Sequence, residues 1–381
     1  MKCRSAKIGQ RACVYPPSST NSKEPSWIAS VKPPSTTSKG IAMPTINASP
    51  LRILFAALVT ALFLVTGSTA YAAEKSKPVV KLATSAWIGY APFYVAVEKN
   101  LFDKYGVKVE LQDFADPALM PSALQSGSIH GAMYTYDQVI MLVANGHDFR
   151  VVMPIDYSNG ADALVASKKI KSIAELKGRR VAYPFSTCDN LLVNYALKSA
   201  GLTEADIKGV DTTPENVPAA LASGVDAGAT YEPNVTKALK LKTGAGFHTL
   251  YTSASAPGLI TDVLYFPAKF IKQNKEQVTA IIRGYLDGLD YMNKHPQEAQ
   301  AIIAKQLAAT AQEVAEQAKG VRNIPLADMT AYYEPRQDAQ SLYTSGAMIA
   351  EIQLKRKQIP KAPSIEDTFD ASFVAAIVAK P

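Results

Sequence analysis

The segment VVKLATSAWIGYAPFYVAVEKNLFDKYGVKVELQDF, residues 79–114, carries the pattern strand, helix, strand. Its first six residues form an apolar run, residues 92–101 have helical spacing, and residues 107–114 alternate like a half-buried strand. The turn between the first strand and the helix crowds four rings together, those of Trp87, Tyr90, Phe93 and Tyr94. A buried turn needs one or two large side chains. The crowding therefore indicates either dense core packing or a turn that faces a ligand.

The same alternation of strands and helices continues along the chain. Asp116 is typical of a helix N-cap, residues 129–134 read as a strand, and Thr135 is expected to cap the following helix. A further helix is predicted over 186–201, and residues 274–319 are almost wholly helical by pattern. This order predicts an α/β fold in which crossover helices join parallel strands.

Two stretches of the chain resemble each other. Residues 121–135 read PSALQSGSIHGAMYT, and residues 218–232 read PAALASGVDAGATYE. Chance similarity among small residues is one explanation, and two related α/β units, each with a tyrosine-bearing loop after a strand, is the other. Because ligands bind outside the carboxyl ends of such strands, two facing units would form a cleft that the rings after residue 84 would line.

The net charge of +7 is confined to the amino-terminal part of the sequence. Of the 40 Lys and Arg and 33 Asp and Glu residues, eight basic residues and one acidic residue precede position 73, which leaves 32 of each sign in residues 73–381. A balanced main part gives no compositional support for a nucleic-acid partner.

The first 72 residues read as a processing signal. The 14-residue apolar run 53–66 follows a basic residue and precedes a small-x-small site that ends at Ala72. We expect residues 43–72 to be a secretory signal peptide, because a membrane-spanning helix needs about 20 apolar residues. A retained anchor is the alternative. Residues 1–42 are interpreted as a non-native or disordered extension before a true start at Met43, or as an organelle transit peptide, and the mature protein is expected to be soluble in the periplasm.

No catalytic, phosphate-binding or cofactor motif occurs in the sequence, so neither a cofactor nor a metal is expected. The four histidines are scattered and favour packing or surface roles over metal ligation. Cys188 lies at a predicted helix start, where a thiol can become nucleophilic, but no base is identifiable and a plain buried thiol is the simpler interpretation.

Polar residues at predicted strand ends and helix starts are the candidates for ligand binding. Ser186 and Thr187 would either contact an anionic ligand group or only cap the helix. Asp162 and Asp262 each interrupt an apolar run, in the apparently paired segments 158–166 and 258–266, and are either ligand contacts or supports of hinge strands. Glu232, on the second tyrosine-bearing loop, favours the cleft.

The chain resembles periplasmic substrate-binding proteins of the sulfonate, nitrate, taurine and thiamine-precursor group. The similarity rests on an ordered set of segments, WIGYAPFYVAVEKNLFDKYGVKVEL (87–111), SIAELKGRRVA (172–182), STCDNLLVNYALKSAGLTEADI (186–207), VPAALASGVDAGATYEPN (217–234) and YFPAKFIKQNKEQVTAIIRGYLDGLDYMNKHPQEA (265–299). The resemblance implies a type II periplasmic-binding-protein fold, with lobe one over 78–163 plus 263–381 and lobe two over 164–262. Two crossing strands would join the lobes around the ligand cleft.

What the resemblance implies about function follows from that fold. The chain would be a monomeric, non-enzymatic solute-binding component of an ABC importer, delivering a small nitrogen- or sulfur-containing organic compound to a permease and an ATPase on separate chains. By position, the resemblance implies contacts from a set of cleft residues: Trp87, Gly89, Tyr90, Thr135, Ser186, Thr187, Tyr231, Glu232 and Asp262.

Departures from the family pattern bear on the solute and on the alternatives. Cys188 and Asp189 stand where relatives that bind sulfonate or nitrate favour small hydroxyl residues and a His or Arg, so a neutral or cationic nitrogenous compound is expected. A binding protein that presents its ligand to a membrane sensor remains an alternative. So does an enzyme like the thiamine-pyrimidine synthases, although their cysteine-rich signature is missing here.

Overall fold

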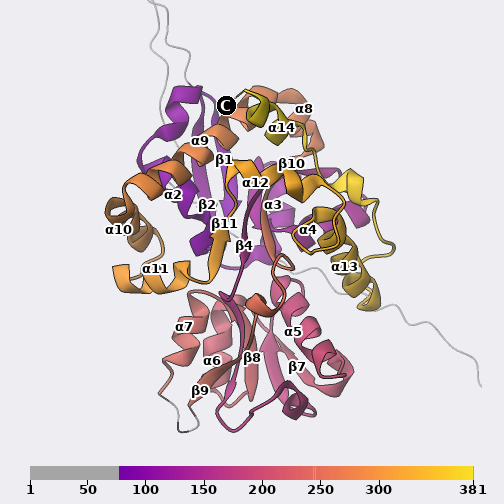
Figure 1. Ribbon diagram of the computed structural model, residues 1–381. Helices are drawn as coiled ribbons and strands as arrows, with labels where there is room; N and C mark the ends of the chain where they lie inside the picture. The colour runs from indigo at the N-terminus through magenta and orange to yellow at the C-terminus, as the bar shows by residue number, and fades with distance from the viewer. Residues whose placement is uncertain (1–76, 243, 245, 381) are drawn as a thin grey trace, which may run out of the picture. The chain divides into compact units, whose positions relative to one another are not determined.

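The computed structural model describes residues 77–242, 244 and 246–380, so the predicted signal peptide and the extension before it lie outside the described residues. These described residues form one compact unit. Within it the strands make two sheets, and the part of the chain around each sheet is called a lobe below (Figure 1).

The sheet of lobe one has six strands in the order β11-β4-β10-β3-β1-β2. Its strands are β1 (Val79–Thr84), β2 (Lys108–Asp113), β3 (Gly131–Thr135), β4 (Phe149–Ser158), β10 (Thr261–Pro267) and β11 (Val321–Asn323). The predicted strands at 79–84 and 107–114 are confirmed as β1 and β2, and they pair in parallel. The predicted helix between them is α2 (Ala91–Glu98), which ends before a 3-10 turn over Leu101–Tyr105.

The sheet of lobe two has five strands in the order β7-β6-β8-β5-β9. Its strands are β5 (Asp162–Ser167), β6 (Arg180–Tyr183), β7 (Lys208–Asp211), β8 (Ala227–Tyr231) and β9 (Phe247–Thr252). In both sheets the central strand pairs in parallel with one neighbour and antiparallel with the other: β3 with β1 and β10, and β8 with β6 and β5. The two resembling stretches therefore occupy equivalent places, each a short helix followed by the central strand.

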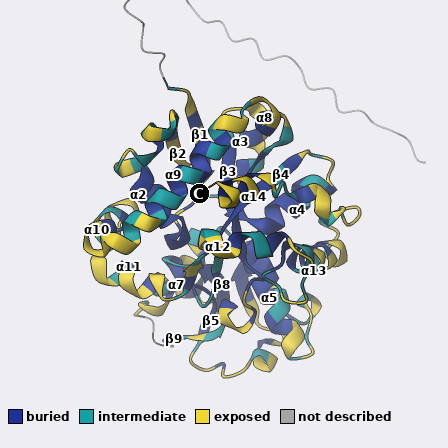
Figure 2. Ribbon diagram, turned by 45° about the horizontal axis from the view of Figure 1, so that its top comes forward, coloured by how far each residue is buried: buried dark blue, intermediate teal, exposed yellow. Residues whose placement is uncertain are grey.

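Helices cover the sheets, and the inner strands β3, β4, β10, β5 and β8 are buried, whereas the outer strands β2 and β7 are largely exposed (Figure 2). Those of lobe two are α5 (Cys188–Ser199), α6 (Val217–Ala222) and α7 (Asn234–Leu239). Those of lobe one are α2, α3 (Met120–Ser126), α4 (Tyr136–Ala144), α8 (Ala268–Gln273), α9 (Lys275–Lys294), α10 (Pro296–Gln306), α11 (Ala311–Ala318), α12 (Leu326–Met329), α13 (Leu342–Lys355) and α14 (Ser372–Ala379). The long helical stretch predicted over 274–319 is confirmed as α9, α10 and α11.

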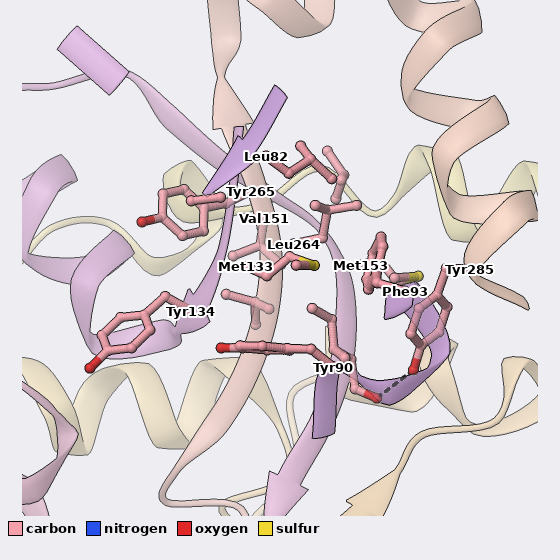
Figure 3. Close-up of a cluster of buried hydrophobic side chains, with 14 of the residues drawn as sticks. Leu82, Tyr90, Phe93, Met133, Tyr134, Val151, Met153, Leu264, Tyr265 and Tyr285 are labelled. Atoms are coloured by element: carbon pink, nitrogen blue, oxygen red, sulfur yellow. Dashed lines mark hydrogen bonds between the residues drawn. The ribbon is translucent and has the colours of Figure 1, made fainter. Parts of the chain in front are cut away.

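Apolar side chains from several strands meet in the core of lobe one (Figure 3). Leu82, Met133, Val151 and Leu264 are almost completely buried there, one from each of four neighbouring strands. Tyr90 and Tyr134 lie at the border of this cluster. None of the described helices is both long and apolar enough to cross a membrane.

The chain passes between the sheets twice, from β4 to β5 and from β9 to β10. The two predicted extended segments pair only where they leave lobe one: β4 is antiparallel to β10, the Ser158 amide donates to the Ile260 carbonyl at 3.0 Å, and β5 then pairs with β8 and β9 instead. Hydrogen bonds among Ser158, Gly160 and Ser253 stabilise this crossing, and these three residues are called the knot below. The Ser253 hydroxyl contacts the Ser158 hydroxyl at 2.7 Å and accepts from the Gly160 amide at 2.8 Å.

Candidate functional site

A narrow cavity lies where the carboxyl ends of strands from both sheets meet. Its lining comes from the turn after β1, the end of β3, the start of β10 and, from lobe two, the start of β5, the end of β8 and the start of α5: Ser85, Trp87, Tyr90, Tyr134, Thr135, Asp162, Cys188, Tyr231, Ile260 and Asp262. The space between these side chains measures about 10 Å³, close to the smallest volume that holds one water molecule. A larger solute can enter only if the lobes part or side chains rotate.

The four crowded rings after β1 have different tasks. Phe93 packs against Tyr285, with ring centroids 4.9 Å apart, and belongs to the core. The Tyr94 hydroxyl lies 3.0 Å from the Trp87 carbonyl oxygen, to which it donates, and so fixes the turn. Only Trp87 and Tyr90 line the cavity. Two of the four rings therefore serve packing and the turn, and the other two face the cavity, where contact with a ligand stays a prediction.

Gly89 supports this turn from behind. A Cβ at this position would overlap the Asp156 carboxyl group and the Trp87 indole nitrogen, so only glycine fits. The same two groups are joined by a hydrogen bond, in which Trp87 Nε1 donates to Asp156 Oδ1 at 3.1 Å. Gly89 thus permits the close approach that orients the Trp87 ring. It is not itself among the lining residues.

Five aspartates are buried in or directly around the cavity, each at most 2% exposed: Asp137, Asp156, Asp162, Asp189 and Asp262. None of them forms an ion pair with a described residue. Burial is the main cause that raises their pKa values. The pKa of Asp162 is about 7 and that of Asp137 is about 6. Burial and repulsion from Asp162 raise the pKa values of Asp156 and Asp189, and burial and repulsion from Asp156 raise that of Asp262.

Several polar atoms that line the cavity lack a hydrogen-bond partner among the described residues. They are Asp162 Oδ2, Thr135 Oγ1 and the hydroxyl oxygens of Tyr134 and Tyr231. Thr135 occupies the predicted N-cap position of α4, but its side chain makes no capping hydrogen bond. Buried polar groups are normally paired, so this concentration is typical of a binding site.

The two lobes touch across the cavity through aromatic rings. Trp87 of lobe one meets Tyr231 of lobe two edge to face, with centroids 5.9 Å apart and an interplanar angle of 87°. The Tyr90 hydroxyl donates to Asp262 Oδ1.

Cys188 lies on the lobe-two side of the cavity, where its Sγ is 3.8 Å from Asp162 Oδ1. Burial and nearby carboxylates raise the Cys188 pKa well above its usual range, which favours the plain thiol over a nucleophile.

Six of the ten residues predicted for the site line the cavity, namely Trp87, Tyr90, Thr135, Asp162, Tyr231 and Asp262. The others lie elsewhere. Ser186 is exposed, and the Thr187 hydroxyl is 3.0 Å from Asp189 Oδ2, to which it donates. Glu232 accepts hydrogen bonds from the Thr236 amide at 3.0 Å and hydroxyl at 2.9 Å, so it is turned toward α7.

Sequence reasoning missed part of the lining, namely Ser85, Tyr134, Cys188 and Ile260. It also missed Asp156, although a signal was present. Asp156 interrupts the apolar run 151–155 in the same way that Asp162 and Asp262 interrupt theirs. The rule that selected those two aspartates would have selected it.

Away from the cavity, a second set of contacts clasps the lobes together. Arg356, just after α13 of lobe one, pairs with Glu204 of lobe two at 3.1 Å and donates from Nη1 to the Phe185 carbonyl at 3.0 Å. Gln358 donates to the same carbonyl at 2.8 Å. Glu204 also accepts from the Tyr183 hydroxyl at 2.6 Å. These four residues and Phe185 are called the clasp below.

Comparison with known proteins places this geometry in a family. A model of the NMT1/THI5-like family matches residues 87–299, more than half of the chain. A protein of Haemophilus influenzae named for thiamine biosynthesis is 30% identical over 222 residues, which cover 56% of this chain and 69% of that protein.

Solved structures with the same fold include binding proteins. The aliphatic sulfonate-binding protein SsuA of Escherichia coli matches with a TM-score of 0.63 and 20% identity, covering 77% of this chain and 97% of its own. The nitrate-binding protein NrtA of Synechocystis PCC 6803 matches with a TM-score of 0.61 and 15% identity, covering 80% and 89%. The desulfurization enzyme DszB matches with a TM-score of 0.56 and 13% identity, covering 80% and 99%, so the fold also carries catalysis. The predicted periplasmic-binding-protein fold is confirmed, and the chain belongs to the NMT1/THI5-like family.

Proposed function

We propose that this protein is the solute-binding component of an ABC importer. It captures a small nitrogen- or sulfur-containing organic compound between its lobes and delivers it to a permease and an ATPase on separate chains. The observation that carries this proposal is the construction of the cavity, whose lining comes from both sheets and includes the contact of Trp87 with Tyr231. A solute bound there favours the closed form because it touches both lobes at once.

Several further features of this function are part of the proposal. The protein acts as a monomer in the periplasm after removal of residues 43–72, and it uses no cofactor. We propose that it binds and does not catalyse, and the raised pKa of the buried Cys188 thiol supports this by disfavouring a cysteine nucleophile. The ten residues predicted from sequence remain the proposed ligand contacts, with the lining residues making the direct ones.

Capture of small molecules tests the proposal. The purified protein is incubated with a cell extract freed of macromolecules, washed, denatured, and the released compounds are identified by mass spectrometry. We expect one compound to be enriched on the wild type and lost on the double variant Trp87→Ala and Tyr231→Ala. Equal retention by both proteins would contradict the cavity assignment. Uptake of the identified compound by cells that lack the gene then distinguishes import from ligand presentation to a sensor.

A further inference from the structure

We propose that the solute is a small organic cation, bound by the carboxyl groups of Asp162 and Asp262 between the rings of Trp87, Tyr90 and Tyr231. This inference rests on the proposed function and specifies the class of compound that the same cavity takes.

The charge of the site supports a cation. Two of the lining residues are aspartates, three further buried aspartates stand directly around them, and no Lys, Arg or His is among the lining residues. A sulfonate or nitrate ion would meet no positive charge from a lining Lys, Arg or His side chain, and any carboxyl group that ionised would repel it. A cation supplies the charge that the buried carboxylates lack.

The unpaired atoms support a ligand that donates hydrogen bonds. Asp162 Oδ2 can only accept when it is ionised, and the hydroxyl oxygens of Thr135, Tyr134 and Tyr231 can accept as well. Trp87, Tyr90 and Tyr231 line the same cavity as these atoms. Aromatic rings attract cations within about 6 Å of the ring centroid. An ammonium or amidinium group satisfies both the acceptors and the rings.

The geometry separates an organic cation from a metal ion. No group of three or more His, Cys, Asp or Glu within the described ranges stands where it could hold a metal. Asp262 and Asp156 are each already engaged through one oxygen, with the Tyr90 hydroxyl and the Trp87 indole. The carboxyl groups are therefore spread around the cavity, as suits several N–H groups on one flat or branched solute.

A consequence is that binding of the cation releases protons. Without a cation the buried carboxyl groups hold protons that keep the site near neutral, and each carboxyl that ionises against the cation gives its proton to solvent. The titratable groups that act on Asp162 are all acidic: Asp137, Asp156, Asp189, Glu232, Asp262 and Cys188. Affinity for a permanent cation should thus rise as the pH increases from 5.5 to 8.

Matched pairs of probes test the proposal. Acetamidinium and acetamide, and benzamidinium and benzamide, share one shape and differ in charge. They are titrated into the Trp27→Phe protein, in which Trp87 is the remaining tryptophan, and its fluorescence and melting temperature are followed, with methanesulfonate and nitrate as anions. We expect at least one amidinium to bind at least tenfold more tightly than its amide. Its affinity should rise severalfold, and up to about tenfold per pH unit for each released proton, between pH 5.5 and 8.

Variants connect the result to the cavity. Asp162→Asn removes one negative charge at nearly constant shape and should abolish the preference for the amidinium, whereas Glu276→Gln, on an exposed part of α9, should leave it unchanged. Equal or tighter binding of the amides would overturn the proposal. Binding of methanesulfonate or nitrate alone would overturn the cationic class and leave solute capture standing. If no probe binds and the capture experiment also retains nothing, both proposals fall.

Discussion

At the scale of the residue, the buried carboxyl group of Asp162 makes stability depend on pH. Its pKa is about 7 in the folded protein, against roughly 3.9 for an exposed aspartate. The folded state therefore binds a proton more tightly than the unfolded state. The stabilisation is complete below the unfolded pKa and is lost as the pH rises through the folded pKa.

We expect the free energy of unfolding of the ligand-free protein to fall between pH 5 and pH 8. This single group contributes a decrease of about 2–3 kcal/mol, and its buried acidic neighbours act in the same direction. Urea denaturation at several pH values measures the effect. Asp162→Asn should flatten the profile and leave the protein more stable than the wild type at pH 8. A wild-type stability that increases over this range would contradict the burial of protonated carboxyl groups.

Gly89 offers a second residue-scale prediction. Gly89→Ala places a methyl group against Asp156 and the Trp87 indole, so we expect a loss of about 1–3 kcal/mol and a changed Trp87 emission spectrum. Gly288→Ala is the matched control, because its methyl group would overlap the Pro92 carbonyl between α2 and α9, away from the cavity. It should destabilise the protein while the emission spectrum stays as in the wild type. Identical spectra for both variants would argue against the orienting role of Gly89.

At the scale of the element, hydrophobic periodicity predicted most strands and helices, but it could not predict where strands change sheets. The apolar runs around Asp162 and Asp262 look alike, yet β5 and β10 belong to different sheets. Sheet membership depends on contacts between distant residues, as in the knot of Ser158 and Ser253, which are separated by 95 positions. No local pattern encodes such a pair.

The candidate site was predictable to a similar degree and for a related reason. Position after a strand located Trp87, Thr135 and Tyr231, because strand ends converge at one edge of a sheet. It could not predict the direction in which a side chain turns. Glu232 follows Tyr231 directly, but Thr236 offers it two hydrogen bonds on α7.

The knot at the crossing strands is itself testable. Ser253→Ala removes the hydroxyl that contacts Ser158 and accepts from the Gly160 amide, and we expect a loss of about 1–2 kcal/mol. Chemical denaturation measures this loss. Ser255→Ala, at an exposed position two residues along the chain, is the control and should change stability by less than about 0.5 kcal/mol. A Ser253 variant as stable as this control would show that the knot contributes nothing to stability.

At the scale of the whole molecule, the clasp should influence ligand affinity although it lies away from the cavity and contacts no ligand. Arg356 and Glu204 join the lobes in the closed arrangement, and their side chains are only 16% and 23% exposed. Any interaction present in the closed form alone adds to the apparent affinity of a ligand that requires closure. Removing it should therefore weaken binding at a distance.

We expect Arg356→Gln to weaken solute binding about 5- to 30-fold, which corresponds to about 1–2 kcal/mol, mainly through faster dissociation. Stopped-flow measurements of Trp87 fluorescence, with the solute identified by capture, test this prediction. Lys355→Gln is the control, because Lys355 is exposed and, within the part of the chain that the structure describes, its ion pair is with Glu351 on its own helix. Equal dissociation rates for the two variants would show that the clasp does not stabilise the closed form.

The thiol of Cys188 has a consequence for how the protein's motion can be followed. It is 2% exposed and lies against the cavity between the lobes, so an alkylating reagent can reach it only during moments of opening. In a protein with Cys3 and Cys13 replaced by serine, the alkylation rate then reports how often the lobes open, in the same way that amide exchange reports transient exposure. A solute that lowers this alkylation rate stabilises the closed form, and the measurement shows this even where binding changes no fluorescence.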